Sequence, residues 1–331
     1  HMSPMLYSAL ALQGKFTIDD LKDFRQWGSP TPGHPERDIK RGIENTSGPL
    51  GQGHSFAAGA AVAEKFLEAR LGKEVMQHKI YAYISDGGVQ EEISQGVGRI
   101  AGNLGLNNLI MFYDANDIQL STECNEVMNE DTTAKYKAWG WNVLTCNGND
   151  VDEIRQALDA ALTEKERPTL IIGKTIMGKG ALKEDGTSYE HSIKTHGAPL
   201  GGNAYINTIK NLGGDIDDPF KVFPEVAELY ANRLKELKNI VEKRHNEEQK
   251  WAEANPEKAK LYKEWFSGEA PKIDWTAVNQ KADIATRAAS AACLSILAEQ
   301  VPNMICSSAD LSNSDKTDGF LKKTKNIVRN D

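Results

Sequence analysis

The middle of this chain alternates short apolar runs with amphipathic stretches, and this alternation limits the possible folds more than any other feature. The apolar runs have the length of buried strands, whereas the stretches between them have the length of helices. Strands are expected at Lys79–Ile84, Leu109–Tyr113, Trp141–Thr145 and Thr169–Lys174, and helices at Glu91–Leu106, Thr132–Trp139 and Val151–Leu162. Helical crossovers place successive strands parallel in one sheet. The pattern therefore predicts an α/β fold with a doubly wound parallel sheet flanked by helices.

Polar residues follow the first two predicted strands. Ser85-Asp86-Gly87-Gly88 comes after the first strand, and Asp114-Ala115-Asn116-Asp117-Ile118 closes the second. Carboxyl ends of parallel strands meet at one edge of a sheet, so Asp86 and Asn116 should converge there. One carboxylate, one amide oxygen and one main-chain carbonyl would leave positions on a hard cation free for phosphate oxygens. The pattern predicts a diphosphate site with Mg²⁺, or with Ca²⁺ or Mn²⁺, although an Asp-Gly turn alone is equally typical of a plain surface turn.

Charge and cysteine usage exclude several classes of partner. The formal net charge is −8, and the lysines and arginines are scattered, so neither nucleic acid nor a membrane is an expected partner. The four cysteines show no CxxC spacing, which favours reduced thiols and a cytoplasmic protein. Apolar stretches stay well below the roughly 18 residues expected of a spanning helix.

The length of 331 residues favours two domains. The expected organisation is a first domain at 1–265 that includes long charged helices at its end, a linker at 266–281, and the truncated start of a second α/β domain at 282–331. In that last part we expect a helix over Ala282–Leu297 and a strand over Asn303–Ser307. A polar, Gly-rich segment at 175–202 is long enough to suggest a functional role.

Three further motifs carry a family resemblance. They are Thr31-Pro32-Gly33-His34-Pro35-Glu36, Gly48-Pro49-Leu50-Gly51-Gln52-Gly53 and His196-Gly197-Ala198-Pro199-Leu200-Gly201. Together with Asp86 and Asn116, whose spacing resembles the thiamin-diphosphate fingerprint, they resemble the transketolase family from His1 to about Ser314. Ser85 and Asp117 depart from that fingerprint, which has Gly and Asn there. The resemblance implies a thiamin-diphosphate-binding domain followed by the start of a pyrimidine-binding domain.

The resemblance also implies a set of cofactor contacts. The matching positions are His1, Gly48, Leu50, Asp86, Gly87, Glu91, Asn116, Ile118, Leu120 and His196, of which Asp86, Asn116 and the carbonyl of Ile118 would hold the metal. Gly48 lets main chain pass against a flat ring, and Leu50 can then cover that ring. Leu120 is equally compatible with a core position. Glu91 matches a glutamate at the family's dimer interface, and it is also an ordinary acidic residue at a helix start.

Catalytic and substrate residues follow from the same resemblance. His1, His34 and His196 match histidines around the thiazolium and the sugar hydroxyls, where imidazole can move protons near neutral pH. Arg287 and Ser314 match residues that grip the sugar phosphate. Their surroundings depart from the family pattern, because Ala288 follows the arginine where the family usually has Lys. His54, His78, His191 and His245 have no matching position.

The implied activity is transfer of a two-carbon ketol unit from a ketose phosphate such as xylulose 5-phosphate to an aldose phosphate such as ribose 5-phosphate, as in the pentose phosphate pathway. A homodimer with each site between two subunits is implied as well. The family's catalytic glutamate would lie beyond Asp331, so we expect this transferase chain to be inactive alone. The alternatives are a non-catalytic or split-subunit cofactor-binding half, a dihydroxyacetone synthase and a 1-deoxyxylulose-phosphate synthase.

Overall fold

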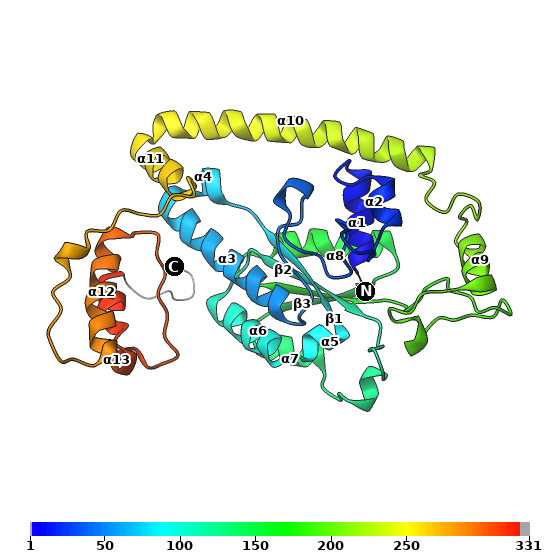
Figure 1. The fold of residues 1–331 in the computed structure, drawn as a ribbon, viewed down its shortest axis with the longest axis horizontal. Coiled ribbons are helices and arrows are strands. Elements are labelled where there is room, and N and C mark those ends of the chain that lie inside the picture. The colour runs from blue at the N-terminus through cyan, green and yellow to red at the C-terminus, as the bar shows by residue number, and fades with distance from the viewer. Residues whose placement is uncertain (1, 325–331) are drawn as a thin grey trace.

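The structure is a computed structural model, and it describes residues 2–324. At its centre is a four-stranded sheet (Figure 1). Its strand order is β1-β2-β4-β3. The strands are β1 (Ile80–Ser85), β2 (Leu109–Ala115), β3 (Asn142–Asn147) and β4 (Thr169–Lys174). All neighbouring strands run parallel. The predicted α/β fold with a parallel sheet is confirmed.

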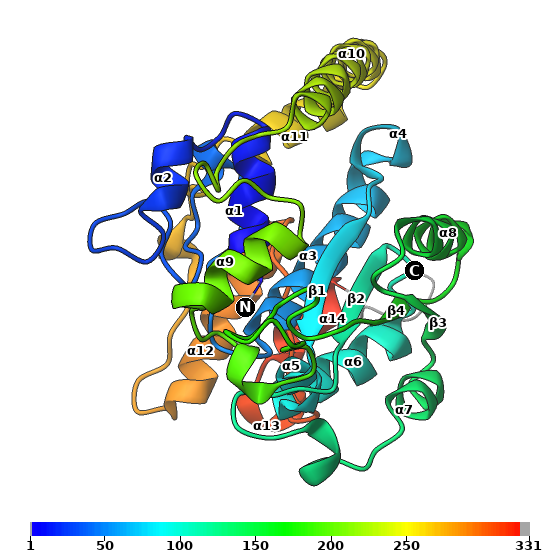
Figure 2. The ribbon, with the colours of Figure 1, turned by 90° about the vertical axis from the view of Figure 1, so that its right-hand side faces the viewer.

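Helices cover both faces of the sheet, and in Figure 2 the strands separate α8 from α6 and α7. The covering helices are α3 (Gln52–Leu71), α6 (Glu92–Leu104) and α7 (Thr132–Ala138) on one face, and α8 (Val151–Thr163) on the other. Ala61 of α3 and Ala101 of α6 are buried in one core cluster with Leu109 and Leu170. Ala161 of α8 is buried on the opposite face. Because alanine is small, these helices can pack close to the strands.

No residue separates the end of β1 from the start of the next helix. Helix α5 (Asp86–Gln90) begins at the residue that follows the strand. The Ser85 hydroxyl accepts a hydrogen bond from the Gly88 N–H at 3.3 Å and so caps the helix. The carboxyl end of β1 therefore places Asp86 at a helix start, directly at the edge of the sheet.

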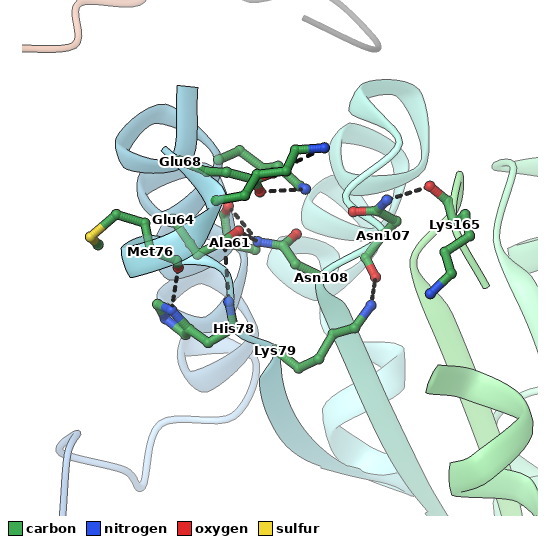
Figure 3. A network of polar contacts seen from close by, with 11 residues as sticks. Ala61, Glu64, Glu68, Met76, His78, Lys79, Asn107, Asn108 and Lys165 are labelled. Atoms are coloured by element: carbon green, nitrogen blue, oxygen red, sulfur yellow. Dashed lines mark hydrogen bonds and ion pairs between the residues drawn. The ribbon is translucent and has the colours of Figure 1, made fainter. Parts of the chain in front are cut away.

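The opposite, amino-terminal edge of the sheet is fastened by a partly buried polar network (Figure 3). Glu64 of α3 accepts hydrogen bonds from the Asn108 side-chain amide at 2.5 Å and from the His78 N–H at 3.2 Å. The Lys79 ammonium donates to the Asn107 carbonyl at 2.7 Å. These contacts join α3 to the segments that enter β1 and β2, so the helix and both strands are fixed relative to one another.

The amino-terminal part forms a small cluster of its own. Helices α1 (Ser3–Leu12) and α2 (Ile18–Lys22) and the 3-10 turn η1 (Ile39–Arg41) surround it. Tyr7 and Phe16 meet edge to face with ring centroids 5.4 Å apart, and both are buried. Such aromatic pairs add about 1 kcal/mol beyond their burial. The cluster supports the loop that carries His34.

The polar segment at 175–202 is irregular but held in place. It contains a single bridge between Leu182 and Ser188 and the 3-10 turn η3 (Ile193–Thr195). Helix α9 (Gly202–Asn211) follows, and its Thr208 hydroxyl accepts a hydrogen bond from the Leu182 N–H at 2.9 Å.

The long charged helices form an outer layer. Helix α10 (Pro224–Ala254) runs along one side of the molecule in Figure 1 and is mostly exposed. Near its end Trp251 is buried in a cluster with Leu71 and Met76. Helix α11 (Pro256–Trp265) then packs against α3 and α4 (Lys73–Met76) through this cluster. The outer layer is therefore anchored at its carboxyl end.

The carboxyl-terminal part is helical among the described residues. It contains η4 (Trp275–Ala277), α12 (Thr286–Gln300), α13 (Ser312–Asp315) and α14 (Asp318–Thr324). The strand predicted over Asn303–Ser307 is wrong, because the backbone there is irregular and no other segment of residues 2–324 pairs with it as a strand. Across residues 2–324, no helix combines enough length and apolar character to cross a bilayer.

Candidate active site

Asp86 and Asn116 lie in contact at the carboxyl edge of the sheet. Ser85 and Asp114 are partners in the β1–β2 register, so the chain leaves both strands at the same level. The Asn116 N–H donates a hydrogen bond to Asp86 Oδ2 at 3.1 Å. Asp86 is 1% exposed and Asn116 4% exposed. The proximity predicted from strand order is thus present, while metal binding by these residues stays a prediction.

The Asp86 carboxylate is buried among neutral donors. The Tyr113 hydroxyl donates to Oδ1 at 2.7 Å, and the Cys124 thiol also forms a hydrogen bond with this carboxylate. Burial raises the pKa of Asp86, and it raises the pKa of Cys124 to about 11. Within residues 2–324 no cation forms an ion pair with Asp86. Because an uncompensated buried carboxylate is costly, this environment fits a bound divalent cation.

The residues after β2 supply the other oxygen atoms. Asn116 Oδ1 accepts a hydrogen bond from the Ile118 N–H at 3.1 Å, which leaves one lone pair of the amide oxygen available. Asp117 adopts a left-handed conformation with φ 64°, and this turns the chain so that Ile118 is buried. In the described part of the chain, no group of three His, Cys, Asp or Glu could hold a metal. A cation here would therefore need further ligands, which fits Mg²⁺ shared with a diphosphate.

The glycine-rich loop before α3 lies beside this pair. A Cβ on Gly87 would lie 3.2 Å from Leu50 Cδ1, so Leu50 covers the residue next to Asp86. Gly48 has φ 152°, and a Cβ there would lie 3.3 Å from the His34 ring. Leu50 is half exposed, and Leu120 is 72% exposed. The loop thus leaves an uncovered apolar side chain above the candidate cation site, which fits a flat ring as ligand.

The three predicted histidines fall in different settings. His34 is exposed and packs against Gly48, so it belongs to the same loop cluster. His196 is partly buried and ends η3, where its N–H donates to the Ile193 carbonyl at 3.1 Å. His1 lies outside the described residues. The catalytic roles of all three histidines stay predictions.

Glu91 and the Arg287–Ser314 pair occupy separate places. Glu91 is exposed at the start of α6, and a Cβ on Gly51 would lie 3.1 Å from its Cβ. The Arg287 guanidinium donates to the Ser314 carbonyl at 3.3 Å, and both residues are exposed. Figure 1 shows α12 and α13 at one end of the molecule, away from α5. Arg287 and Ser314 lie in contact, but one chain does not bring them to Asp86, and their binding of a sugar phosphate stays a prediction.

A buried pair, His54 and Ser94, lies beside the glycine-rich loop, and the sequence did not point to it. His54 is 4% exposed, and its Nδ1 lies 2.6 Å from the hydroxyl oxygen of Ser94. Burial lowers the pKa of His54 to about 4, with a hydrogen bond to the Tyr83 main chain acting in the opposite direction. Tyr113, which holds Asp86, was also missed. Tyr113 stands in the expected strand before Asn116, whereas no local pattern connects His54 to Ser94, 40 residues apart.

The fold and the position of these residues are those of α/β proteins whose ligand sites lie at the carboxyl ends of parallel strands. Residues 1–271 match the family described as "Transketolase, thiamine diphosphate binding domain". The chain belongs to this family.

Two transketolases illustrate the similarity in sequence. That of Staphylococcus aureus (strain MRSA252) is 39% identical over 331 residues, covering 96% of this chain and 48% of that protein. That of Streptococcus pyogenes serotype M6 is 40% identical over 323 residues, covering 96% and 43%. The chain therefore spans about half the length of the curated relatives it matches.

Solved transketolase structures share the fold. The enzyme from Leishmania mexicana aligns with a TM-score of 0.87 at 33% identity, covering 94% of this chain and 47% of that one. The enzyme from Campylobacter jejuni aligns with a TM-score of 0.80 at 34% identity, covering 94% and 48%.

Proposed function

We propose that this chain is the cofactor-binding portion of a transketolase. Its activity would be transfer of a two-carbon ketol unit from a ketose phosphate, such as xylulose 5-phosphate, to an aldose phosphate, such as ribose 5-phosphate. The observation that carries the proposal is the buried Asp86–Asn116 contact beside the loop of Gly48 and Leu50. The family match over residues 1–271 supports thiamin diphosphate as the cofactor.

Each site residue has a proposed task. Asp86, Asn116 and the Ile118 carbonyl would hold Mg²⁺, or Ca²⁺ or Mn²⁺ in its place, while Gly87 lets main chain approach the diphosphate. When bound, thiamin diphosphate supplies the electron sink for cleavage of a carbon–carbon bond. His34 and His196 would hold sugar hydroxyls and move their protons.

The remaining contacts would surround the cofactor and complete the same site. Gly48, Leu50 and Leu120 would border its rings, and His1 would join the two other histidines at the substrate. Glu91 would lie at the dimer interface and link the two active sites through water.

Sugar phosphates are the proposed substrates. Two transketolase structures from Pichia stipitis, each 32% identical to this chain, are described as complexes with sedoheptulose 7-phosphate and with fructose 6-phosphate. In this chain Arg287 carries a guanidinium suited to a phosphate, and Ser314 lies beside it. Since this pair lies away from Asp86 in one chain, we propose a homodimer in which two subunits form each site.

All four cysteines are free thiols, which supports a cytoplasmic location.

Calorimetric titration of the 331-residue chain with thiamin diphosphate tests the cofactor site. We expect binding that requires Mg²⁺ and that Asp86→Ala or Asn116→Ala lowers at least about 100-fold, since each variant removes a metal ligand. Asp159→Ala, which removes an exposed carboxylate on α8, should bind like the native chain. Unchanged affinity in both site variants would exclude the site as assigned.

A coupled assay tests the activity itself. Because the chain spans about half the length of its curated relatives, we expect almost no ketol transfer from xylulose 5-phosphate to ribose 5-phosphate by this chain alone. Clear turnover without a partner chain would contradict that expectation. In that case, a preference for formaldehyde over ribose 5-phosphate as acceptor would favour a dihydroxyacetone synthase.

A further inference from the structure

The loop that carries His34 encloses a hollow outside the cation site. The hollow has a volume of about 930 Å³, and among residues 2–324 its lining comes only from the segment from Arg25 to Arg41. This volume is in the range of small-molecule sites. The Trp27 indole is fully exposed in the wall. The hollow is therefore large enough for a sugar-sized ligand and is formed by one continuous stretch of chain.

The lining is basic, although the chain as a whole has a net charge of −8. Asp38 is already paired, because its carboxylate contacts the Arg41 guanidinium at 2.6 Å, and Arg41 also lies over the Phe16 ring. Arg25, Arg37 and Lys40 form no ion pair within residues 2–324. The remaining carboxylate in the lining is that of Glu36. Three cations against one carboxylate leave the hollow with an excess of positive charge.

The loop is fixed in shape before any ligand binds. The Tyr7 hydroxyl donates to the Pro32 carbonyl at 2.7 Å, and the buried Thr31 hydroxyl donates to the Asp20 carbonyl at 2.7 Å. The Arg25 N–H donates to the Thr31 carbonyl at 3.0 Å. A Cβ on Gly33 would lie 2.6 Å from Arg25 Nε, so the guanidinium lies flat on the main chain there. A site held in this way loses little conformational entropy on binding.

The hollow adjoins the candidate active site through His34. The His34 ring belongs to the lining of the hollow, and it also packs against Gly48 of the loop above the cation site. A ligand in the hollow therefore lies beside a residue that the proposed function assigns to the substrate. Arg287 and Ser314 belong to another part of the molecule and do not line this hollow.

We propose that this hollow is a second anion site, separate from the phosphate contacts proposed for Arg287 and Ser314, and that it binds the phosphate group of a sugar phosphate through Arg25, Arg37 and Lys40. Guanidinium and ammonium groups are the usual partners of phosphate oxygens in proteins. The identity of the ligand as a sugar phosphate rests on the proposed function, whereas the anion site rests on the charges and shape of the loop alone. Glu36 opposes the bound charge and sets an upper limit on affinity.

Calorimetric titration of the full chain with ribose 5-phosphate, without thiamin diphosphate or Mg²⁺, tests the site. The double variant Arg37→Gln/Lys40→Gln should bind about tenfold more weakly, since it removes two of the three donors. Glu36→Gln should bind about twofold more tightly, because it removes the opposing carboxylate. Lys235→Gln/Lys250→Gln, which removes two exposed charges from α10, should bind like the native chain.

Four further measurements test which part of the ligand binds and where it binds. Ribose without a phosphate should bind at least about tenfold more weakly than ribose 5-phosphate, and inorganic phosphate should compete. Trp27 emission should change on saturation, and Trp27→Phe should lose that change while keeping the calorimetric signal. The tenfold loss should persist in Arg287→Gln. Equal binding of ribose, or equal loss in the α10 control, would overturn the proposal.

Failure of this site and failure of the proposed function give different results. Asp86→Ala should abolish metal-dependent cofactor binding and leave ribose 5-phosphate binding in the hollow unchanged. Loss of cofactor binding with an intact phosphate response would preserve the anion site. Intact cofactor binding with no response of Arg37→Gln/Lys40→Gln would refute the anion site and preserve the cofactor site.

Discussion

His54 is a buried side chain that lies where three helices meet beside the candidate site. It extends from α3 toward Ser94 of α6, and a Cβ on Gly88 of α5 would lie 3.6 Å from its ring. The histidine thus fills the space between the helix that follows the glycine loop and the two helices that follow β1. Its neutral form fits there, because one ring nitrogen accepts while the other carries hydrogen.

This setting predicts a specific pH dependence. Burial lowers the pKa of His54 to about 4, below the ordinary value of 6.5, so the folded state favours the neutral ring. The resulting stability is present above pH 6.5 and is lost as pH falls from 6.5 toward 4. Between pH 7 and pH 5 the native chain should lose about 2 kcal/mol through this group. Urea unfolding at both pH values measures the loss.

A variant isolates the contribution of this one ring. His54→Asn should reduce the loss between pH 7 and pH 5 by about 2 kcal/mol, since asparagine does not titrate in this range. His245→Asn, which replaces an exposed histidine on α10, should leave the loss as it is in the native chain. The same loss in His54→Asn as in the native chain would show that His54 is not buried as described.

The positions of single residues could be predicted from the sequence where they follow directly from a neighbouring strand or helix. Asp86 and Asn116 follow strands directly, so strand order alone brings them to one edge of the sheet. The contact of His54 with Ser94 depends on how α3 packs against α6, and nothing in either segment encodes that distance. Tyr113 could be assigned to a strand, but its hydroxyl contact with Asp86 required the register.

At the scale of elements, helix α6 is fixed by how closely its glycines approach α7 and the turn after it. A Cβ on Gly102 would fall inside contact distance of the Trp139 carbonyl oxygen, which is main chain and cannot move aside. Gly96, in the same helix, has nothing within 4 Å of the position of a Cβ. A methyl group at Gly102 would therefore clash with main chain, whereas a methyl group at Gly96 would meet no neighbouring atom.

Alanine substitutions at these two glycines should have effects of opposite sign. Gly102→Ala should destabilise the fold by about 3 kcal/mol or more, because backbone must shift to admit the methyl group. Gly96→Ala should stabilise it by about 0.5–1 kcal/mol, through higher helix propensity. Chemical denaturation of both variants and of the native chain measures these differences in the free energy of unfolding. Similar stability of the Gly102→Ala variant and the native chain would contradict the packing described for α6.

Whether a segment forms a strand depends both on its own sequence and on distant segments that can pair with it. The strands between residues 80 and 174 were predictable, because apolar runs and amphipathic helices alternate with regular lengths. Asn303–Ser307 has a similar apolar run, yet it forms no strand, because a strand requires a neighbour to pair with. Sequence shows what a segment can form, whereas pairing decides whether it does.

At the scale of the whole molecule, two features point to association. Helices α12 and α13, which carry Arg287 and Ser314, lie at one end of the molecule and away from α5, which begins with Asp86 (Figure 1). A site that uses all three residues therefore requires a second subunit. In addition, Phe56 of α3 and Ile93 and Ile100 of α6 are all about half exposed, although the two helices pack together. Exposed apolar side chains on adjoining helices are typical of a surface that another subunit covers.

We therefore expect the chain to form a dimer through α3 and α6. Sedimentation equilibrium should give about twice the chain mass of 36.4 kDa, with tighter association when thiamin diphosphate and Mg²⁺ are present. Ile93→Asp/Ile100→Asp should give a monomer, because burying two carboxylates in an apolar interface is costly. Val151→Asp, at a residue of similar exposure on α8, should remain dimeric. A native chain that stays monomeric at about 100 μM with the cofactor would contradict the shared site, because a complex that catalyses between subunits must form below such concentrations.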